Sequence, residues 1–379
     1  MEKLSRRNFL LTASAATLAA AAPALGAPLV ASHRRQRVLV ASNAPDGILA
    51  YDWDPANGEL APAGVAAPLA NVNWITYSSG HEYLFAASDV SSFNGKPTGA
   101  VASFRVVRGE LKPLSEQNSA GLGTCHVALD HSGRVLLAAD YTGGSASSYL
   151  VTGGKIGPAV WSEHYTGHGP NADRQQSAHA HFAAISLDNR FAYINDLGGD
   201  CIHIYSLNAT TAKLTPAGSY QARPGAGPRT LHFYGNWHTA YSVNELDSTV
   251  DVLKWNRING SLTLVTRIEL LPEGYQGPTR ACDTIITRNG LFVYFANRDN
   301  DFLYSFHANP VTGELTPIGR TPCGGKTPRN FVLDPTENWM LVANQDSNLI
   351  SVFRRNPVTG ELATEGKSFP AAEPMRILF

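Results

Sequence analysis

The chain repeats one pattern seven times, at intervals of 46 to 56 residues. Each repeat contains an apolar, β-rich run that ends in Asn or Asp, then a polar turn and a run with period-two alternation such as "CIHIY". The apolar runs end at Asn43, Asp89, Asp140, Asp196, Asn244, Asn297 and Asn344. An interval of about 50 residues accommodates four antiparallel strands, and seven such units form a ring. We therefore expect an all-β fold, a seven-bladed β-propeller of four-stranded antiparallel blades.

One seven-residue stretch recurs within these repeats. The sequence "NPVTGEL" occupies residues 309–315 and 356–362, and a looser copy, "DPANGEL", occupies residues 54–60. Asn and Pro favour turns, and Gly313 and Gly360 are suited to a positive φ. We interpret the stretch as the hairpin between the third and fourth strands of a blade, with no catalytic role.

The first repeat lacks an innermost strand of its own. Each of the other six apolar runs is preceded by a short strand candidate, such as "RNFVL" at residues 329–333. The chain ends in "PMRILF", residues 374–379, which resembles "PRNFVL" at residues 328–333. We expect this C-terminal strand to complete the first blade and close the ring, which hides two strand edges that would otherwise favour aggregation.

Residues 1–27 resemble a twin-arginine export signal. Arg6 and Arg7 precede an Ala/Leu-rich run that ends in small residues near Ala27. The run is short, weakly hydrophobic and interrupted by Pro23, which disfavours the alternative of an uncleaved membrane anchor. We expect the twin-arginine translocon to be a partner during export. The propeller domain, residues 28–379, is then expected to be periplasmic, without membrane contact after signal removal.

Composition argues against several classes of ligand. The net charge is −1 and only 16% of residues are charged, with no basic stripe to bind nucleic acid. The four cysteines show no C-x-x-C spacing, which disfavours a zinc site. His179 and His181 share one strand face, but no third ligand stands at a suitable spacing. We expect no metal and no cofactor.

The innermost strands of a propeller line its central channel. Because neighbouring strands are antiparallel, the starts of the innermost strands and the ends of the adjacent apolar runs meet at one mouth. The strand starts carry Cys125, His126, His181, Arg229, Cys282, Asp283 and Arg329. The run ends carry Asp140, Asp196, Glu245, Arg298 and Gln345. We interpret the recurring terminal Asn or Asp as structural and the mouth itself as a small-molecule site.

Four charged residues stand out at this mouth. Glu245 and Arg298 occupy one equivalent position with opposite charge, whereas a structural position would tend to repeat its chemistry. Arg229 and Arg329 both follow a proline, which leaves a shared structural role open. If their role is not structural, two guanidinium groups that point into one channel favour an anionic ligand.

Four long stretches carry a family resemblance: "HAHFAAISLDNRFAYINDLGGDCIHIY", "GPRTLHFYGNWHTAYSVNELDSTVDVL", "VYFANRDNDFLYSF" and "GGKTPRNFVLDPTENWMLVANQDSNLISVF". They closely resemble the seven-bladed propeller lactonases, which include bacterial 6-phosphogluconolactonases and the fungal 3-carboxymuconate cyclase. The resemblance covers nearly all of the chain after the signal. It departs at residues 282–285, "CDTI", where family members often have "AEIH".

The resemblance implies an active site at the channel mouth. It assigns catalysis to His181, Arg229 and Glu245, with Arg298 or Arg329 as a further arginine. Substrate-binding candidates beside them are Arg329, His126, Asp283, Gln345 and His179.

We expect a 6-phosphogluconolactonase-like hydrolase that opens a small, sugar-type lactone to its hydroxy acid. Glu245 or His181 would activate water, and Arg229 and Arg298 would stabilise the oxyanion. Two alternatives remain: a non-catalytic propeller that binds an anionic metabolite or protein, and a carboxymuconate-type cycloisomerase. Because the usual phosphorylated substrate belongs to the cytoplasm, an exported enzyme is expected to act on an unphosphorylated sugar lactone or another small lactone.

Overall fold

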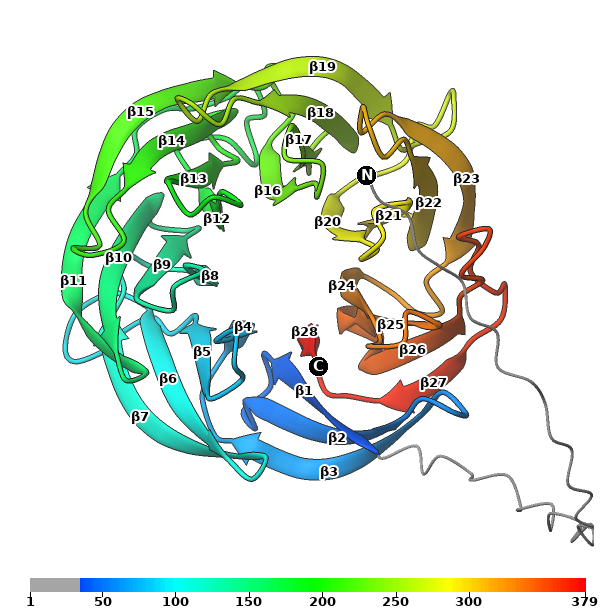
Figure 1. Ribbon diagram of the computed structural model, residues 1–379, viewed down its shortest axis with the longest axis horizontal. Coiled ribbons are helices and arrows are strands. Elements are labelled where there is room, and N and C mark those ends of the chain that lie inside the picture. Colours follow the sequence, from blue (N-terminus) through cyan, green and yellow to red (C-terminus); the bar gives the residue numbers. More distant parts are fainter. Residues whose placement is uncertain (1–34) are drawn as a thin grey trace, which may run out of the picture. The chain divides into compact units, whose positions relative to one another are not determined.

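The computed structural model describes residues 35–379, which form seven four-stranded antiparallel sheets around a central channel (Figure 1). The predicted seven-bladed, all-β propeller is therefore confirmed. Within this range the only helix is a single 3-10 turn, η1 (Gln345–Ser347), and none is long and apolar enough to cross a membrane. The predicted export signal, residues 1–27, lies outside the described residues, as do residues 28–34 of the predicted propeller domain.

Each blade runs from an innermost strand at the channel to an outermost strand at the rim (Figure 1). Blade 1 consists of β28 (Pro374–Leu378), β1 (Gln36–Ser42), β2 (Ile48–Asp54) and β3 (Glu59–Ala67). Blade 2 consists of β4 (Val72–Tyr77), β5 (Tyr83–Ser88), β6 (Ala100–Val107) and β7 (Glu110–Asn118). Blade 3 consists of β8 (Thr124–Leu129), β9 (Val135–Asp140), β10 (Ser145–Thr152) and β11 (Lys155–His164). Blade 4 consists of β12 (Ala180–Ile185), β13 (Phe191–Asp196), β14 (Cys201–Leu207) and β15 (Leu214–Gln221).

The remaining three blades follow the same order. Blade 5 consists of β16 (Pro228–Phe233), β17 (Thr239–Asn244), β18 (Thr249–Trp255) and β19 (Leu262–Glu269). Blade 6 consists of β20 (Ala281–Ile286), β21 (Phe292–Asn297), β22 (Phe302–Ala308) and β23 (Leu315–Pro322). Blade 7 consists of β24 (Pro328–Leu333), β25 (Trp339–Asn344), β26 (Leu349–Arg354) and β27 (Lys367–Pro370).

Two distant parts of the chain pair to close the ring. β28 runs antiparallel to β1, with Leu39 opposite Leu378 and Val40 opposite Ile377. Ile377 is fully buried, and its backbone N–H donates to Asn330 Oδ1 at 3.0 Å, which ties β28 to the innermost strand of blade 7. The predicted closure by the C-terminal strand is confirmed.

The hydrophobic core lies between neighbouring blades. At the junction of blades 1 and 7, the indole rings of Trp53 and Trp339 meet edge to face with centroids 6.1 Å apart. Val38 of blade 1 joins Leu341 and Ile350 of blade 7 in the same cluster. Because neighbouring blades cover both faces of a sheet, second strands such as β9, β13 and β17 are buried along their whole length and do not alternate between buried and exposed residues.

The repeated "NPVTGEL" stretches form the predicted hairpins between third and fourth strands. Gly313 and Gly360 have φ values of 74° and 77°, which glycine adopts without strain. Each hairpin also contacts the preceding blade. Tyr241 Oη donates to the Gly313 carbonyl at 2.7 Å, and Tyr294 Oη donates to the Gly360 carbonyl at 2.7 Å. The sequence recurs because the same turn and the same contact between blades recur.

Ring closure by β28 can be tested through its buried side chain. Ile377→Ala should lower the free energy of unfolding by about 2–5 kcal/mol, because it leaves a cavity in the core between blades. Removal of residues 375–379 should destabilise further, because it also exposes β1. Urea unfolding measures both effects. Ile258→Ala is the control, since Ile258 is 83% exposed, and it should change stability by less than about 0.5 kcal/mol. Unchanged unfolding of both altered β28 variants would contradict the closure role.

Candidate active site

The register of the blades creates two rings of side chains at one end of the channel. In every blade, the last residue of the second strand pairs with the first residue of the innermost strand. The residues that follow the second strands form what we call the mouth ring: Asn43, Asp89, Tyr141, Leu197, Glu245, Arg298 and Gln345. The second residues of the innermost strands form what we call the throat ring: Asn73, Cys125, His181, Arg229, Cys282, Arg329 and Met375.

A β-bulge lies at each throat-ring position. In blade 4, Ala180 pairs with Asp196 and Phe182 pairs with Asn195, which leaves His181 as the extra residue. The pairing shifts at the same point of every other blade. A bulge re-aims the extra side chain and is common beside active sites. Here the bulges account for the throat-ring side chains that line the channel.

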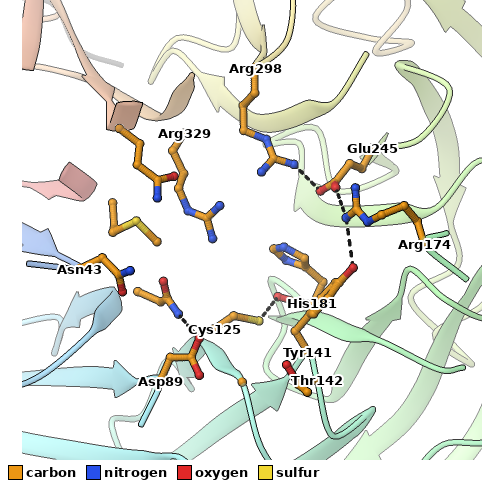
Figure 2. A pocket seen from close by; sticks show the side chains of 14 residues that line it. Asn43, Asp89, Cys125, Tyr141, Thr142, Arg174, His181, Glu245, Arg298 and Arg329 are labelled. Carbon is orange, nitrogen blue, oxygen red and sulfur yellow. Dashed lines mark hydrogen bonds and ion pairs between the residues drawn. The ribbon is translucent and has the colours of Figure 1, made fainter. Parts of the chain in front are cut away.

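Both rings contribute to a cavity of about 260 Å³ at this mouth (Figure 2). Six mouth-ring residues line it: Asn43, Asp89, Tyr141, Glu245, Arg298 and Gln345. Five throat-ring residues line it: Asn73, Cys125, His181, Arg329 and Met375. The other lining residues are Gly123, Thr142 and Arg174. Residues from all seven blades are thereby combined in one polar site.

Glu245 is the centre of an ion-pair cluster on one side of the cavity. Its Oε2 lies 2.8 Å from Arg229 Nε and 2.6 Å from Arg298 Nη2, and its Oε1 accepts a hydrogen bond from Arg174 Nη2 at 2.6 Å. The Arg229 and Arg298 contacts are charge contacts, since neither nitrogen is aligned for a hydrogen bond. Burial by itself raises the pKa of Glu245, but the charges of Arg298 and Arg229 more than offset it and hold that pKa well below its usual value. The carboxylate is therefore ionised and engaged.

Arg174 reaches the site from the loop between β11 and β12. Besides Glu245, its Nη2 donates to Tyr141 Oη at 3.0 Å. The next residue, Gln175, is fully buried and donates through Nε2 to the Leu197 carbonyl at 2.9 Å, which anchors the loop. Arg174 is not among the residues predicted from the sequence, because nothing in the strand pattern indicates where a long loop returns to the channel.

His181 lies in the cavity wall as a neutral side chain. It is buried, and its Nδ1 has no hydrogen-bond partner among the described residues. Burial and the charge of Arg229 hold its pKa well below the usual histidine range. Since Nδ1 is enclosed, Nε2 is the ring nitrogen left to meet a ligand.

Arg329 differs from the other cavity arginines in having no carboxylate partner within residues 35–379. Burial, together with the charges of Arg298 and Arg229, lowers its pKa to about 9. It remains a cation at neutral pH. A half-buried guanidinium without a counter-ion is suited to an anionic or strongly polar ligand.

The other sequence candidates lie at several depths. Gln345 lines the cavity, whereas His179 stacks on Tyr141 with ring centroids 4.4 Å apart and is outside the lining. His126 lies deeper, with its ring centroid 3.8 Å from that of Phe182. Asp283 also lies outside the lining: His232 Nε2 is 3.1 Å from its Oδ1.

The structure therefore brings six of the nine candidates to the cavity or its ion pairs, and five of these are charged or titratable: His181, Arg229, Glu245, Arg298 and Arg329. Gln345 joins them as a neutral lining residue, and His126, His179 and Asp283 do not. Within the described part of the chain, no three His, Cys, Asp or Glu side chains converge in a way that could hold a metal ion.

Asp89 and Asn43 reveal a one-residue error in the sequence alignment of the repeats. The sequence pattern predicts that Asn43 and Asp89 end their runs as Asn244 does, but β1 and β5 end one residue earlier, at Ser42 and Ser88. Asp89 is thus the register equivalent of Glu245, not of the structural Asn244. The shared patterns at the strand ends did not distinguish the two registers, since both place a polar residue after an apolar run.

Known proteins share both this sequence and this architecture. The family described as "Lactonase, 7-bladed beta-propeller" matches residues 35–379. A 6-phosphogluconolactonase from Bacillus subtilis (strain 168) is 30% identical over 299 residues, which cover 78% of this chain and 83% of the relative. A 6-phosphogluconolactonase from Formosa agariphila is 32% identical over 304 residues, which cover 78% of this chain and 84% of the relative.

A solved structure agrees with these matches. The periplasmic gluconolactonase from Pseudomonas aeruginosa superposes with a TM-score of 0.84 at 28% identity, over 90% of this chain and 98% of that protein. Since the family match spans every described residue and the blades repeat the same architecture, this chain belongs to the seven-bladed β-propeller lactonase family.

Proposed function

We propose that this chain hydrolyses a small, sugar-type lactone to its hydroxy acid by base-activated water, with arginine side chains stabilising the oxyanion. The observation that carries the proposal is the meeting, in one cavity, of neutral His181 with the guanidinium groups of Arg298 and Arg329. The relatives named 6-phosphogluconolactonase and gluconolactonase support the same class of substrate.

Positive charge exceeds negative charge around the cavity. Four guanidinium groups face two carboxylates: Arg174, Arg229, Arg298 and Arg329 against Glu245 and Asp89. Attack of water on a lactone moves negative charge onto the carbonyl oxygen. Fixed donors in a partly buried site stabilise that charge better than mobile water does. The excess of two positive charges therefore favours the transition state.

Glu245 organises this charge and does not act as a free base. Its two oxygens already contact Arg174, Arg229 and Arg298, so a proton would have to displace an ion pair. The role of Glu245 is to hold Arg229 and Arg298 in place. His181, the other base expected from the sequence, is neutral and presents Nε2 either to a water or to the carbonyl oxygen.

The unpaired Arg329 suits a lactone that carries an anionic group such as a phosphate or carboxylate. The proposed export through residues 1–27 favours an unphosphorylated sugar lactone instead, and the periplasmic gluconolactonase among the relatives supports that location. The two substrates differ in the charge that they present to Arg329, which makes them separable by experiment.

A panel of lactones with titration of the acid released tests the activity. The wild-type protein should hydrolyse gluconolactone or its 6-phosphate, and Arg298→Ala should lower kcat by about 10²–10³-fold, as expected for loss of an oxyanion donor. Binding without turnover would favour the non-catalytic alternative. Ring closure of a carboxymuconate without lactone hydrolysis would favour the cycloisomerase.

Glu245→Gln should reduce stability as well as turnover. It leaves Arg229 and Arg298 buried without their shared anion, at a cost of about 3–5 kcal/mol in unfolding free energy at pH 7. A carboxylate with a lowered folded-state pKa stabilises above its unfolded pKa of about 4.3 and loses that contribution as the pH falls. The difference in unfolding free energy between wild type and variant, measured by urea unfolding, should therefore become smaller below about pH 4. Exposed Glu365 provides the control, because Glu365→Gln should behave like wild type at both pH values.

Arg329→Met tests the anionic end of the substrate. Loss of a charge-assisted contact worth about 1.5–3 kcal/mol should raise KM for 6-phosphogluconolactone by about 10–100-fold. KM for neutral gluconolactone should change much less. Arg134→Met, on an exposed turn, is the matched control and should leave both constants unchanged. Equal effects on the two substrates would remove Arg329 from recognition of the anion.

A further inference from the structure

A second carboxylate stands in the mouth ring at the same register position as Glu245. Asp89 follows β5 in blade 2, as Glu245 follows β17 in blade 5, and both line the cavity. Figure 2 shows the two side chains on opposite sides of the cavity. The backbone of Asp89 is fixed by Asn71, whose carbonyl accepts from Asp89 N at 2.9 Å and whose Nδ2 donates to the Asp89 carbonyl at 3.2 Å.

The two carboxylates differ in what they bind. Glu245 contacts three guanidinium groups, whereas the Asp89 carboxylate accepts one hydrogen bond, from Asn73 Nδ2 at 3.3 Å. No ion pair involves Asp89 anywhere in residues 35–379. Asp89 is therefore a carboxylate at the cavity whose oxygens remain available to a ligand or a water.

The acidic residues that end the second strands of blades 3 and 4 already accept hydrogen bonds from other parts of the fold. Asp140 accepts hydrogen bonds from Thr124 at 2.7 Å and Ser145 at 3.0 Å, both inside blade 3. Asp196 accepts a hydrogen bond from the His179 backbone at 2.7 Å. Neither lines the cavity. Asp140 and Asp196 are the last residues of their strands, whereas Asp89 follows the last residue of β5. This one-residue difference distinguishes the two structural acids from Asp89, which lines the cavity.

The surroundings of Asp89 favour proton uptake more than those of an exposed aspartate. Burial raises its pKa above the usual value, and the Asn73 hydrogen bond and the charge of Arg329 on β24 offset this only in part. The other titratable groups of the lining are Cys125 on β8, Tyr141 after β9 and His181 on β12, with Glu245 and its arginines on the far side.

The environment of His181 indicates which ring nitrogen carries its proton. Nδ1 is buried without a partner, and an orphaned N–H is rarer in proteins than an unused acceptor. We therefore place the proton on Nε2, facing the cavity. In that tautomer His181 donates a hydrogen bond to a carbonyl oxygen and has no free lone pair there to accept a proton from water.

We propose that Asp89 is the general base of the lactone hydrolysis, a role that rests on the proposed function above. Its carboxylate takes a proton from water as the water oxygen bonds to the carbonyl carbon, and the carbonyl π electrons become the oxyanion held by the arginines and His181. When the oxyanion collapses, the bond between the carbonyl carbon and the ring oxygen breaks. The leaving ring oxygen then takes the proton back from Asp89. One lactone and one water become one hydroxy acid, and the carboxylate is restored.

Asp89→Asn tests this role without a large change of shape. We expect kcat on the accepted lactone to fall by about 10²–10⁴-fold. The rise of kcat/KM with pH on the acid side should disappear, because the group that must lose its proton is gone. His181→Gln should lower kcat but should keep the rise of kcat/KM on the acid side (the acid limb of the pH profile). Asp46→Asn removes a carboxylate from the exposed β1–β2 turn and is the matched charge control, with wild-type rate and pH profile.

Chemical rescue separates a base from a residue that only positions Arg329. The rate of Asp89→Ala should rise with formate concentration, and not with chloride at equal ionic strength, because formate supplies the missing carboxylate. Thermal unfolding of each variant shows whether it is folded. A wild-type-like rate and acid limb in Asp89→Asn, or no formate rescue of a folded Asp89→Ala, would overturn the assignment while leaving the lactonase proposal standing. Absence of turnover by the unaltered protein on every lactone would remove both.

Discussion

Antiparallel pairing between β1 and β28 is the constraint on which the rest of this structure depends. It joins Leu39 to Leu378 and so converts seven sheets in a row into a ring. The entropic cost of bringing such distant segments together grows only with the logarithm of their separation, so one buried strand such as β28 is able to offset it. With the ring closed, Asp89 of blade 2 and Arg329 of blade 7 line the same cavity.

Within the ring, backbone geometry repeats while side-chain chemistry does not. Every innermost strand has a bulge at its second position, yet the residue presented there is His181 in blade 4, Arg229 in blade 5 and Met375 in blade 1. The repeat therefore places one side chain of each of the seven blades at an equivalent position facing the central channel. Chemistry enters where residues at equivalent positions differ, which is why the mouth and throat rings, and not the recurring turns, carry the candidate site.

Glu245 and Asp89 illustrate how environment divides roles between equivalent residues. Three guanidinium groups stabilise the ionised form of Glu245, so its charge serves to fix the arginines. Burial has the opposite effect on Asp89 and raises its pKa above the usual value, which its single amide partner offsets only in part. Carboxyl groups whose environments move their pKa values apart are suited to different tasks in one reaction. The proposed mechanism uses one as an anchor and the other as a base.

The sequence by itself determined the number of blades, their strand order, the hairpin turns and the closing strand, because these follow from local alternation and turn residues that recur with the period. It also placed Arg229, Glu245, Arg298 and Arg329 at one mouth. Tertiary structure alone decided how these charges pair, that Arg174 returns from a loop to join them, and that Asp89 shares the register of Glu245. It also left Asp283 outside the cavity lining, paired with His232. The reason is that ion pairs, loop paths and bulges depend on contacts between residues far apart in the chain, and a one-residue shift at a strand end reverses which side chain faces the channel.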